Sequence, residues 1–98
     1  MGMYYWAEIV VGLPYDEVDE EVKEKVMDEQ YHPVQDLSPY YDGGGEGLFG
    51  ISIRCSGDYS WTEIEDLGDL DCDIESAKRD FTNLTGLKPR VYLTTRGG

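Results

Sequence analysis

The first stretch of the chain, Tyr4 to Leu13, is rich in aromatic and β-branched residues whose side chains alternate between two sets. Residues 5, 7, 9 and 11 fall on one side and residues 4, 6, 8 and 10 on the other, a pattern that predicts a β-strand with two partly apolar faces. Residues 47–55 alternate in the same way, and residues 90–95 form a last β-branched segment. The pattern therefore predicts three clear strands.

Two other stretches have a helical period. Val18, Val22 and Val26 recur at every fourth position of residues 15–30, and the acidic residues cluster on the opposite side. This predicts an amphipathic helix, with Asp16 as its N-cap. A second helix follows from apolar residues at helical spacing, beginning at Asp71 or Asp73 and ending at Gly86 as the C-cap. Its apolar positions are Ile74, Ala77, Phe81 and Leu84.

The remaining segments complete a fold prediction. Residues 31–47 contain two prolines and four glycines, which predicts a long loop. Residues 60–65, SWTEIE, are predicted to pair with 47–55 as a hairpin. The resulting order, strand-helix-strand-strand-helix-strand, is that of the ferredoxin-like split βαβ architecture. We thus expect one α+β domain over residues 1–98, with both helices on one face of an antiparallel sheet.

The predicted sheet has a second face, on which two interpretations stay open. It serves as a self-association or partner surface, or the 31–47 loop folds over it. The alternation assigns to the helix-covered face Ala7, Ile9, Ile51, Ile53, Cys55, Val91 and Leu93, and to the other face Tyr4, Trp6, Leu48, Arg54 and Tyr92. Burial is accordingly expected for Cys55.

Length and composition limit the class of protein. A chain of 98 residues suits one core, and no run approaches the roughly 20 apolar residues of a membrane span. The N-terminus lacks a basic segment followed by an apolar one, so we expect a soluble cytoplasmic protein. Cys55 and Cys72 are too few for a disulfide framework and are expected to be free thiols.

Candidate chemistry is weak throughout the chain. Asp69-x-Asp71-x-Asp73-x-Glu75 resembles the start of a calcium loop, but Ile74 replaces the required glycine and the run enters a helix. Acids of this kind at a helix start are explained by the helix dipole. The GGGEG segment at 43–47 lacks the lysine of a phosphate loop, and His32 is the only histidine. We predict no metal, no cofactor and no catalytic residue.

Charge is the one extreme property, because 21 acidic residues face 8 basic ones for a net charge of −13. Such a field repels nucleic acid and anionic membranes and attracts basic proteins. Residues 16–29 hold eight acids and two lysines over about 21 Å, whereas duplex DNA of that length carries roughly 12 charges. Residues 58–75 hold eight more acids and no base. If the fold brings the two runs close together, they form two acidic ridges that imitate a nucleic-acid backbone.

The sequence therefore predicts a small acidic protein-binding domain rather than an enzyme. A basic partner surface is expected, such as the phosphate-binding site of a nucleic-acid-handling protein, which the domain would block; this profile is typical of small virus-type inhibitors. Trp61 is either a core residue or an anchor. The predicted partner-binding residues are Asp16, Glu17, Glu20, Glu21, Glu24, Asp28, Asp66, Asp69, Asp71, Asp73, Trp6, Tyr40 and Tyr41. The alternative is a dimeric structural or regulatory module, acidic for solubility or for a saline habitat.

Overall fold

The computed structural model describes residues 5–29, 33–37 and 47–97 of the chain. Its elements are β1 (Tyr5–Pro14), the 3-10 turn η1 (Tyr15–Glu17), α1 (Glu20–Asp28), β2 (Gln35–Leu37), β3 (Leu48–Cys55), α2 (Leu67–Thr85) and β4 (Arg90–Gly97). In this part of the chain the four strands form one antiparallel sheet in the order β2-β3-β1-β4. The predicted α+β class is confirmed.

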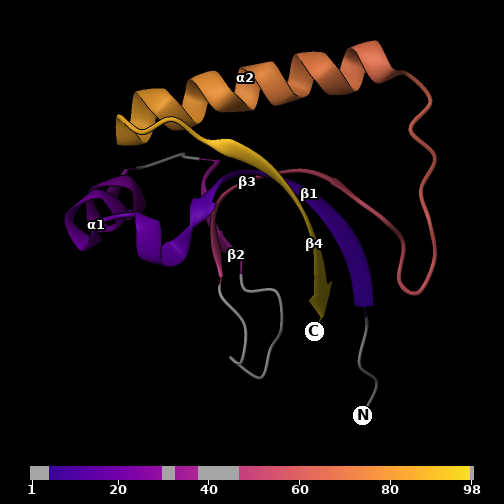
Figure 1. Cartoon of the computed structure of the whole chain (residues 1–98), viewed down its shortest axis with the longest axis horizontal. Coiled ribbons are helices and arrows are strands. Elements are labelled where there is room, and N and C mark those ends of the chain that lie inside the picture. Colours follow the sequence, from indigo (N-terminus) through magenta and orange to yellow (C-terminus); the bar gives the residue numbers. More distant parts are fainter. Residues whose placement is uncertain (1–4, 30–32, 38–46, 98) are drawn as a thin grey trace.

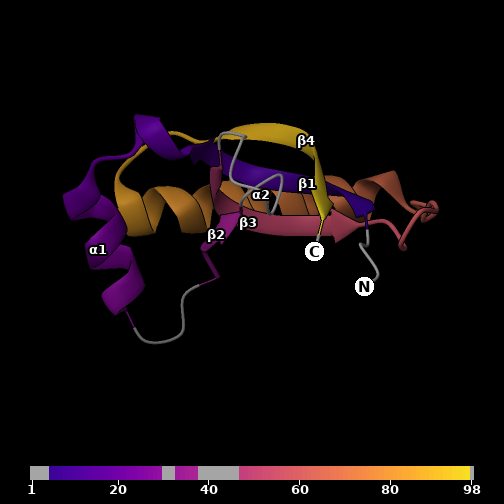
Figure 2. The same cartoon turned by 90° about the horizontal axis from the view of Figure 1, so that it is seen from below.

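The two helices occupy different places relative to the sheet. α2 runs along one face and packs on β1 and β3, whereas β4 pairs with β1 at the edge of the sheet (Figure 1). α1 lies beyond the end of the strands, against the C-terminal end of α2 (Figures 1 and 2). The prediction that both helices cover one sheet face therefore describes α2 but not α1. α2 thus covers β1 and β3 on this face and α1 adds Val26 to the same core, whereas Leu93 of β4 remains exposed.

The main core lies between α2 and the sheet. Its centre is the pair of fully buried rings of Phe49 on β3 and Phe81 on α2, whose centroids are 6.4 Å apart in an edge-to-face arrangement. The other buried members of this cluster are Val11, Leu13, Val18, Val26, Val34, Ile51 and Ala77. A smaller cluster contains Val10, Leu37 and Leu48, with Tyr92 packed against it. The strands thus bury apolar side chains on both faces, as the alternation in β1 predicts.

The predicted strand over residues 60–65 is wrong, since this segment is irregular and all six of its side chains are exposed. Its alternation offers no apolar face, because Trp61 falls in line with two glutamates and Ile64 with Thr62 and Asp66. Besides β1, the strand that pairs with β3 is β2, inside the predicted 31–47 loop. Burial of Leu37 and of Val34 beside it explains why the chain pairs there. Residues 31, 32 and 38–46 of that loop, which include His32 and most of the GGGEG segment, lie outside the described residues.

β3 carries one residue more than the matching part of β1. The two strands pair in one register up to Ile9–Arg54 and in another from Val10–Ser52 onward, so Ile53 is an extra residue. This is a β-bulge, which bends a strand and changes the side on which the following residues lie.

The bulge corrects two predictions made from strict alternation. Arg54, expected on the face away from the helices, reaches α2, where its Nη2 lies 2.7 Å from Asp73 Oδ2. Cys55, expected to be buried in line with Ile53, is exposed and pairs with Glu8 of β1.

Both helices begin at different residues from those predicted. The first helix was expected to start at Asp16, but α1 starts after Asp19, because the buried Val18 has an extended backbone that separates η1 from α1. α2 begins at Leu67, before the predicted Asp71 or Asp73. The predicted C-cap is confirmed, since Gly86 follows α2 with a φ of 75°. Within the described part of the chain, no helix combines the length and the apolar composition needed to cross a membrane.

Candidate partner-binding surface

The acidic residues predicted on the first helix are exposed, but they do not form one uninterrupted row. Glu17 lies in η1 and is paired with Arg90, with 2.6 Å between Oε1 and Nη2. Glu20 lies 3.0 Å from the ammonium group of Lys23, whose stem is buried. Both ion pairs reduce the negative field of this surface. The predicted acidic residues on this surface are Asp16 and Glu17 in η1 and Glu20, Glu21, Glu24 and Asp28 in α1.

A second acidic surface surrounds the start of α2, and we call it the acidic end. α2 has 19 residues and is therefore about 28 Å long. α1 packs against its other end (Figure 1), so the structure does not bring the two predicted acidic ridges together. The acidic end consists of the exposed residues Asp58, Glu63, Glu65, Asp66, Asp69, Asp71, Asp73 and Glu75.

Asp66 explains why acids gather at this point of the chain. Its Oδ1 accepts hydrogen bonds from the backbone N–H groups of Gly68 at 2.8 Å and Asp69 at 3.3 Å, which makes it the N-cap of α2. Further acids in the first turns are stabilised by the partial positive charge of a helix N-terminus. The start of α2 is thus an ordinary acidic helix start.

The calcium-like pattern lies inside α2. Residues two apart on a helix point about 200° from each other, so Asp69 and Asp73 lie on one side of α2 and Asp71 and Glu75 on the other, and the four do not surround one ion. Among the described residues, no group of three or more His, Cys, Asp or Glu side chains is placed to hold a metal ion.

The predicted aromatic anchors have different positions. Trp6 is partly buried, and its Nε1 donates a hydrogen bond of 3.0 Å to Glu8 Oε1. Tyr40 and Tyr41 lie outside the described residues. Trp61, for which two interpretations were open, is 85% exposed and is therefore not a core residue.

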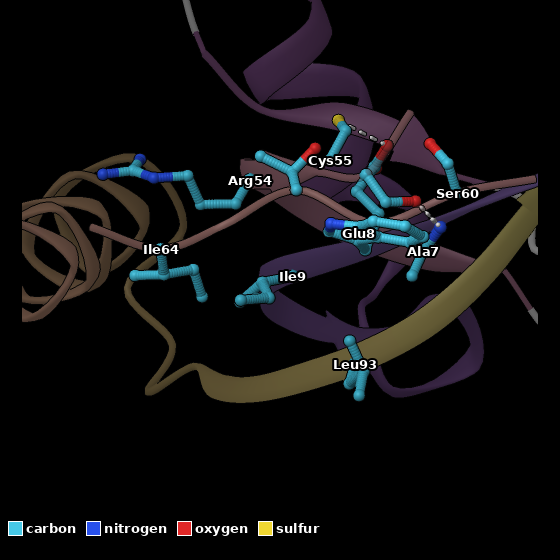
Figure 3. A pocket seen from close by; sticks show the side chains of 11 residues that line it. Ala7, Glu8, Ile9, Arg54, Cys55, Ser60, Ile64 and Leu93 are labelled. Carbon is cyan, nitrogen blue, oxygen red and sulfur yellow. Dashed lines mark hydrogen bonds between the residues drawn. The ribbon is translucent and has the colours of Figure 1, made fainter. Parts of the chain in front are cut away.

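Trp61 lies at an open pocket of about 270 Å³ that the sequence did not predict. Apolar side chains from three parts of the chain line it: Ile9 from β1, Leu93 from β4 and Ile64 from the irregular segment. In Figure 3, Ile9 and Ile64 point toward each other across this space. Leu93 is 77% and Ile64 39% exposed, so the pocket leaves large apolar side chains in water.

Backbone hydrogen bonds hold the segment that carries Trp61 against β1. The N–H groups of Ser56 and Tyr59 donate to the carbonyl groups of Ala7 and Tyr5, each at 2.8 Å. The hydroxyl group of Ser56 accepts from the N–H of Ala7 at 2.8 Å, and the rings of Tyr5 and Tyr59 meet edge to face at 5.5 Å. The segment is therefore anchored where it leaves β3, although its side chains remain exposed.

A buried carboxylate supports the wall of this pocket. Glu8 is only 3% exposed, and its Oε1 accepts hydrogen bonds from Trp6 and, at 3.3 Å, from the thiol of Cys55. The contact with Cys55 connects β1 with β3.

An acidic groove adjoins the apolar pocket and shares Arg54 and Ile64 with it. Arg54 is held by Asp73, so its charge is already matched. The remaining lining residues are acidic, namely Glu63, Glu65, Asp66 and Asp69. An apolar pocket and a negatively charged groove thus lie side by side at the acidic end.

Comparison with known proteins identifies no relative. A scan against models of protein families gives no match, and searches of curated proteins and of solved structures find no similar chain.

Proposed function

We propose that this protein is a small acidic protein-binding domain that receives a basic segment of a partner protein at its acidic end. One observation supports this most directly: exposed acids border an open apolar pocket, and the cation between them, Arg54, is already paired with Asp73. A surface with both properties attracts a basic partner and offers apolar area for close contact.

The proposed partner is a nucleic-acid-handling protein, and binding would block its phosphate-binding site. Residues 66–75 carry five carboxylates along about 14 Å of helix, where duplex DNA would carry roughly 8 charges. Two of the five are paired with cations, Asp73 with Arg54 and Glu75 with Lys78, which leaves a net of three negative charges. A protein surface that contacts phosphates would meet anionic oxygens here at less than half the linear charge density of DNA.

Two variants with equal charge test this function. In the first, Glu63, Glu65, Asp69 and Asp71 are changed to the corresponding amides, which leaves the N-cap Asp66 and the Asp73–Arg54 pair intact. In the second, Glu21, Glu24, Asp28 and Glu29 on and just after α1 are changed in the same way. Each variant loses four negative charges, so an effect of net charge alone appears in both.

The measurement is capture of proteins from a nuclease-treated lysate on the immobilised domain, with elution by increasing salt. The captured protein must be released by duplex DNA in competition. We expect the first variant to lose this protein and the second to retain it. If both variants lose the captured protein equally, binding depends on net charge alone. If the first variant retains the protein and the second loses it, the binding site lies on α1.

A dimeric module remains the second candidate, because Leu93 and Val91 are exposed on β4, an edge strand of the described sheet. Its test is the mass in solution. A dimer predicts twice the chain mass of 11.1 kDa at high salt, where an apolar interface persists and binding to a basic partner weakens. The strand order β2-β3-β1-β4, with β1, α1, β2, β3, α2 and β4 in sequence, also leads us to propose the strand topology of the ferredoxin-like architecture for this fold, with α1 displaced beyond the end of the sheet.

A further inference from the structure

We propose that the pocket between β1, β4 and the irregular segment is an anchor site, which binds one large aliphatic or aromatic side chain next to a Lys or Arg of the partner. This inference rests on the proposed function and specifies the kind of segment that the acidic end recognises. The apolar side chain enters the pocket lined by Ile9, Ile64, Trp61 and Leu93, and the neighbouring cation lies over the acidic groove.

The size of the pocket limits what it can take. Sites for whole small molecules usually measure roughly 300–1,000 Å³. At about 270 Å³ and open to solvent, this pocket suits a single side chain presented by a larger partner (Figure 3). The hydrogen bonds that tie residues 56–59 to β1 anchor the segment that carries Trp61 and Ile64 at the point where it leaves β3.

The apolar side chains that line the pocket are exposed, which indicates a surface for a partner rather than a part of the core. Trp61 and Leu93 are among the most exposed large apolar side chains of the described chain, and both lie at this one pocket. α2 packs on β1 and β3 and leaves Leu93 of β4 uncovered. Adjacent exposed apolar residues with a polar rim are typical of interaction sites.

The charge of the neighbouring groove determines which partner segment binds at the pocket. The groove beside the pocket holds Glu63, Glu65, Asp66 and Asp69, while Arg54 is engaged by Asp73. These carboxylates attract a basic segment of the partner, whereas a neutral or acidic segment would gain no such attraction. A second copy of this chain is disfavoured, because each copy has a net charge of −13.

The test uses two short synthetic peptides that differ at one position. Both consist of lysines and glycines around a central residue, which is leucine in one and serine in the other. Binding is measured by NMR titration of the full chain at low salt. Burial of most of a leucine side chain predicts about tenfold tighter binding of the leucine peptide, with amide shifts concentrated at residues 60–66 and 92–94.

Two variants on β4 make the assignment specific. Leu93→Ser removes an exposed lining residue and should abolish most of the difference between the peptides. Val91→Ser, two residues away on the same side of the strand and 44% exposed, does not line the pocket and should preserve the difference.

The outcomes separate this inference from the proposed function. Binding of the two peptides within twofold of each other would overturn the anchor site while leaving electrostatic binding intact. Failure of both peptides to bind at low salt would overturn the proposed function and the anchor with it. A dimer at high salt that Leu93→Ser dissociates would assign the pocket to a second copy and also overturn the inference.

Discussion

The start of α2 provides a direct test of why acids gather there. In Asp66→Ala the helix loses the acceptor for the N–H groups of Gly68 and Asp69, at 2.8 and 3.3 Å. Replacement of an N-cap by alanine costs about 0.5–2 kcal/mol of stability, and loss of a favourable charge at the helix N-terminus adds about 0.3–1 kcal/mol. Relief of repulsion among the neighbouring acids offsets the smaller of these contributions.

We therefore expect the free energy of unfolding to fall by about 1 kcal/mol. For a domain of this length that change lowers the Tm by about 4–8 °C. The protein stays folded, because domains of this kind have about 5–15 kcal/mol of stability. Thermal and urea unfolding followed by circular dichroism measure both quantities.

Two control variants separate the cap from the charge. Asp66→Asn removes the charge but keeps an acceptor that caps helices well, so it should recover most of the loss. Asp71→Ala removes an exposed charge four residues after the first residue of the helix and should change stability by no more than about 0.5 kcal/mol. If Asp71→Ala were as destabilising as Asp66→Ala, or if asparagine gave no recovery, the capping argument would be wrong.

Four further results are expected. Gly50→Ala should cost about 2 kcal/mol or more in urea unfolding, because its Cβ would lie 2.4 Å from the Val11 carbonyl oxygen and 2.9 Å from the Cα of Gly12; native stability would contradict this close approach. Phe81→Ala should cost about 3–5 kcal/mol and Phe81→Leu much less, and equal losses would count against a packing origin. Trp61→Ser should leave the Tm nearly unchanged while removing the tryptophan fluorescence most accessible to iodide; a large fall in Tm would show that Trp61 is structural. Calcium should raise the Tm no more than sodium at equal ionic strength, whereas an extra shift would reveal a calcium site.

The parts of the fold with a long, regular pattern were predictable from the sequence. β1, β3 and β4 each extend over eight or more residues with clear alternation, and the body of α2 repeats its apolar side chains at helical spacing. β2 has only three residues, too few for a period to be recognised. Its position depends on burial of Leu37 next to Leu48 of β3, a contact between segments that are separated by ten residues in the sequence.

The candidate site was predictable only in its charge. Exposure of the acids follows from their positions on the helices, but the distance between the two acidic surfaces depends on where α1 packs. The pocket unites Ile9, Ile64 and Leu93 from three separated segments, and no local pattern joins them. One sequence signal indicated the exposure of Trp61. In a strand over residues 60–65, Trp61 would share its face with Glu63 and Glu65 rather than with other apolar residues, so the segment has no apolar face to bury.

The extra residue in β3 affects how this chain has to be compared with any relative. Ile53 shifts the alternation by one position, so that Arg54 lies on the side of α2 and borders the pocket. An alignment by hydrophobic pattern alone would be shifted by one residue after Ile53, so it would match residues that lie on opposite faces of the sheet. Because bulges are kept within families, a relative that preserves the pocket should have an additional residue at this point, followed by a basic residue that faces an acid on the second helix.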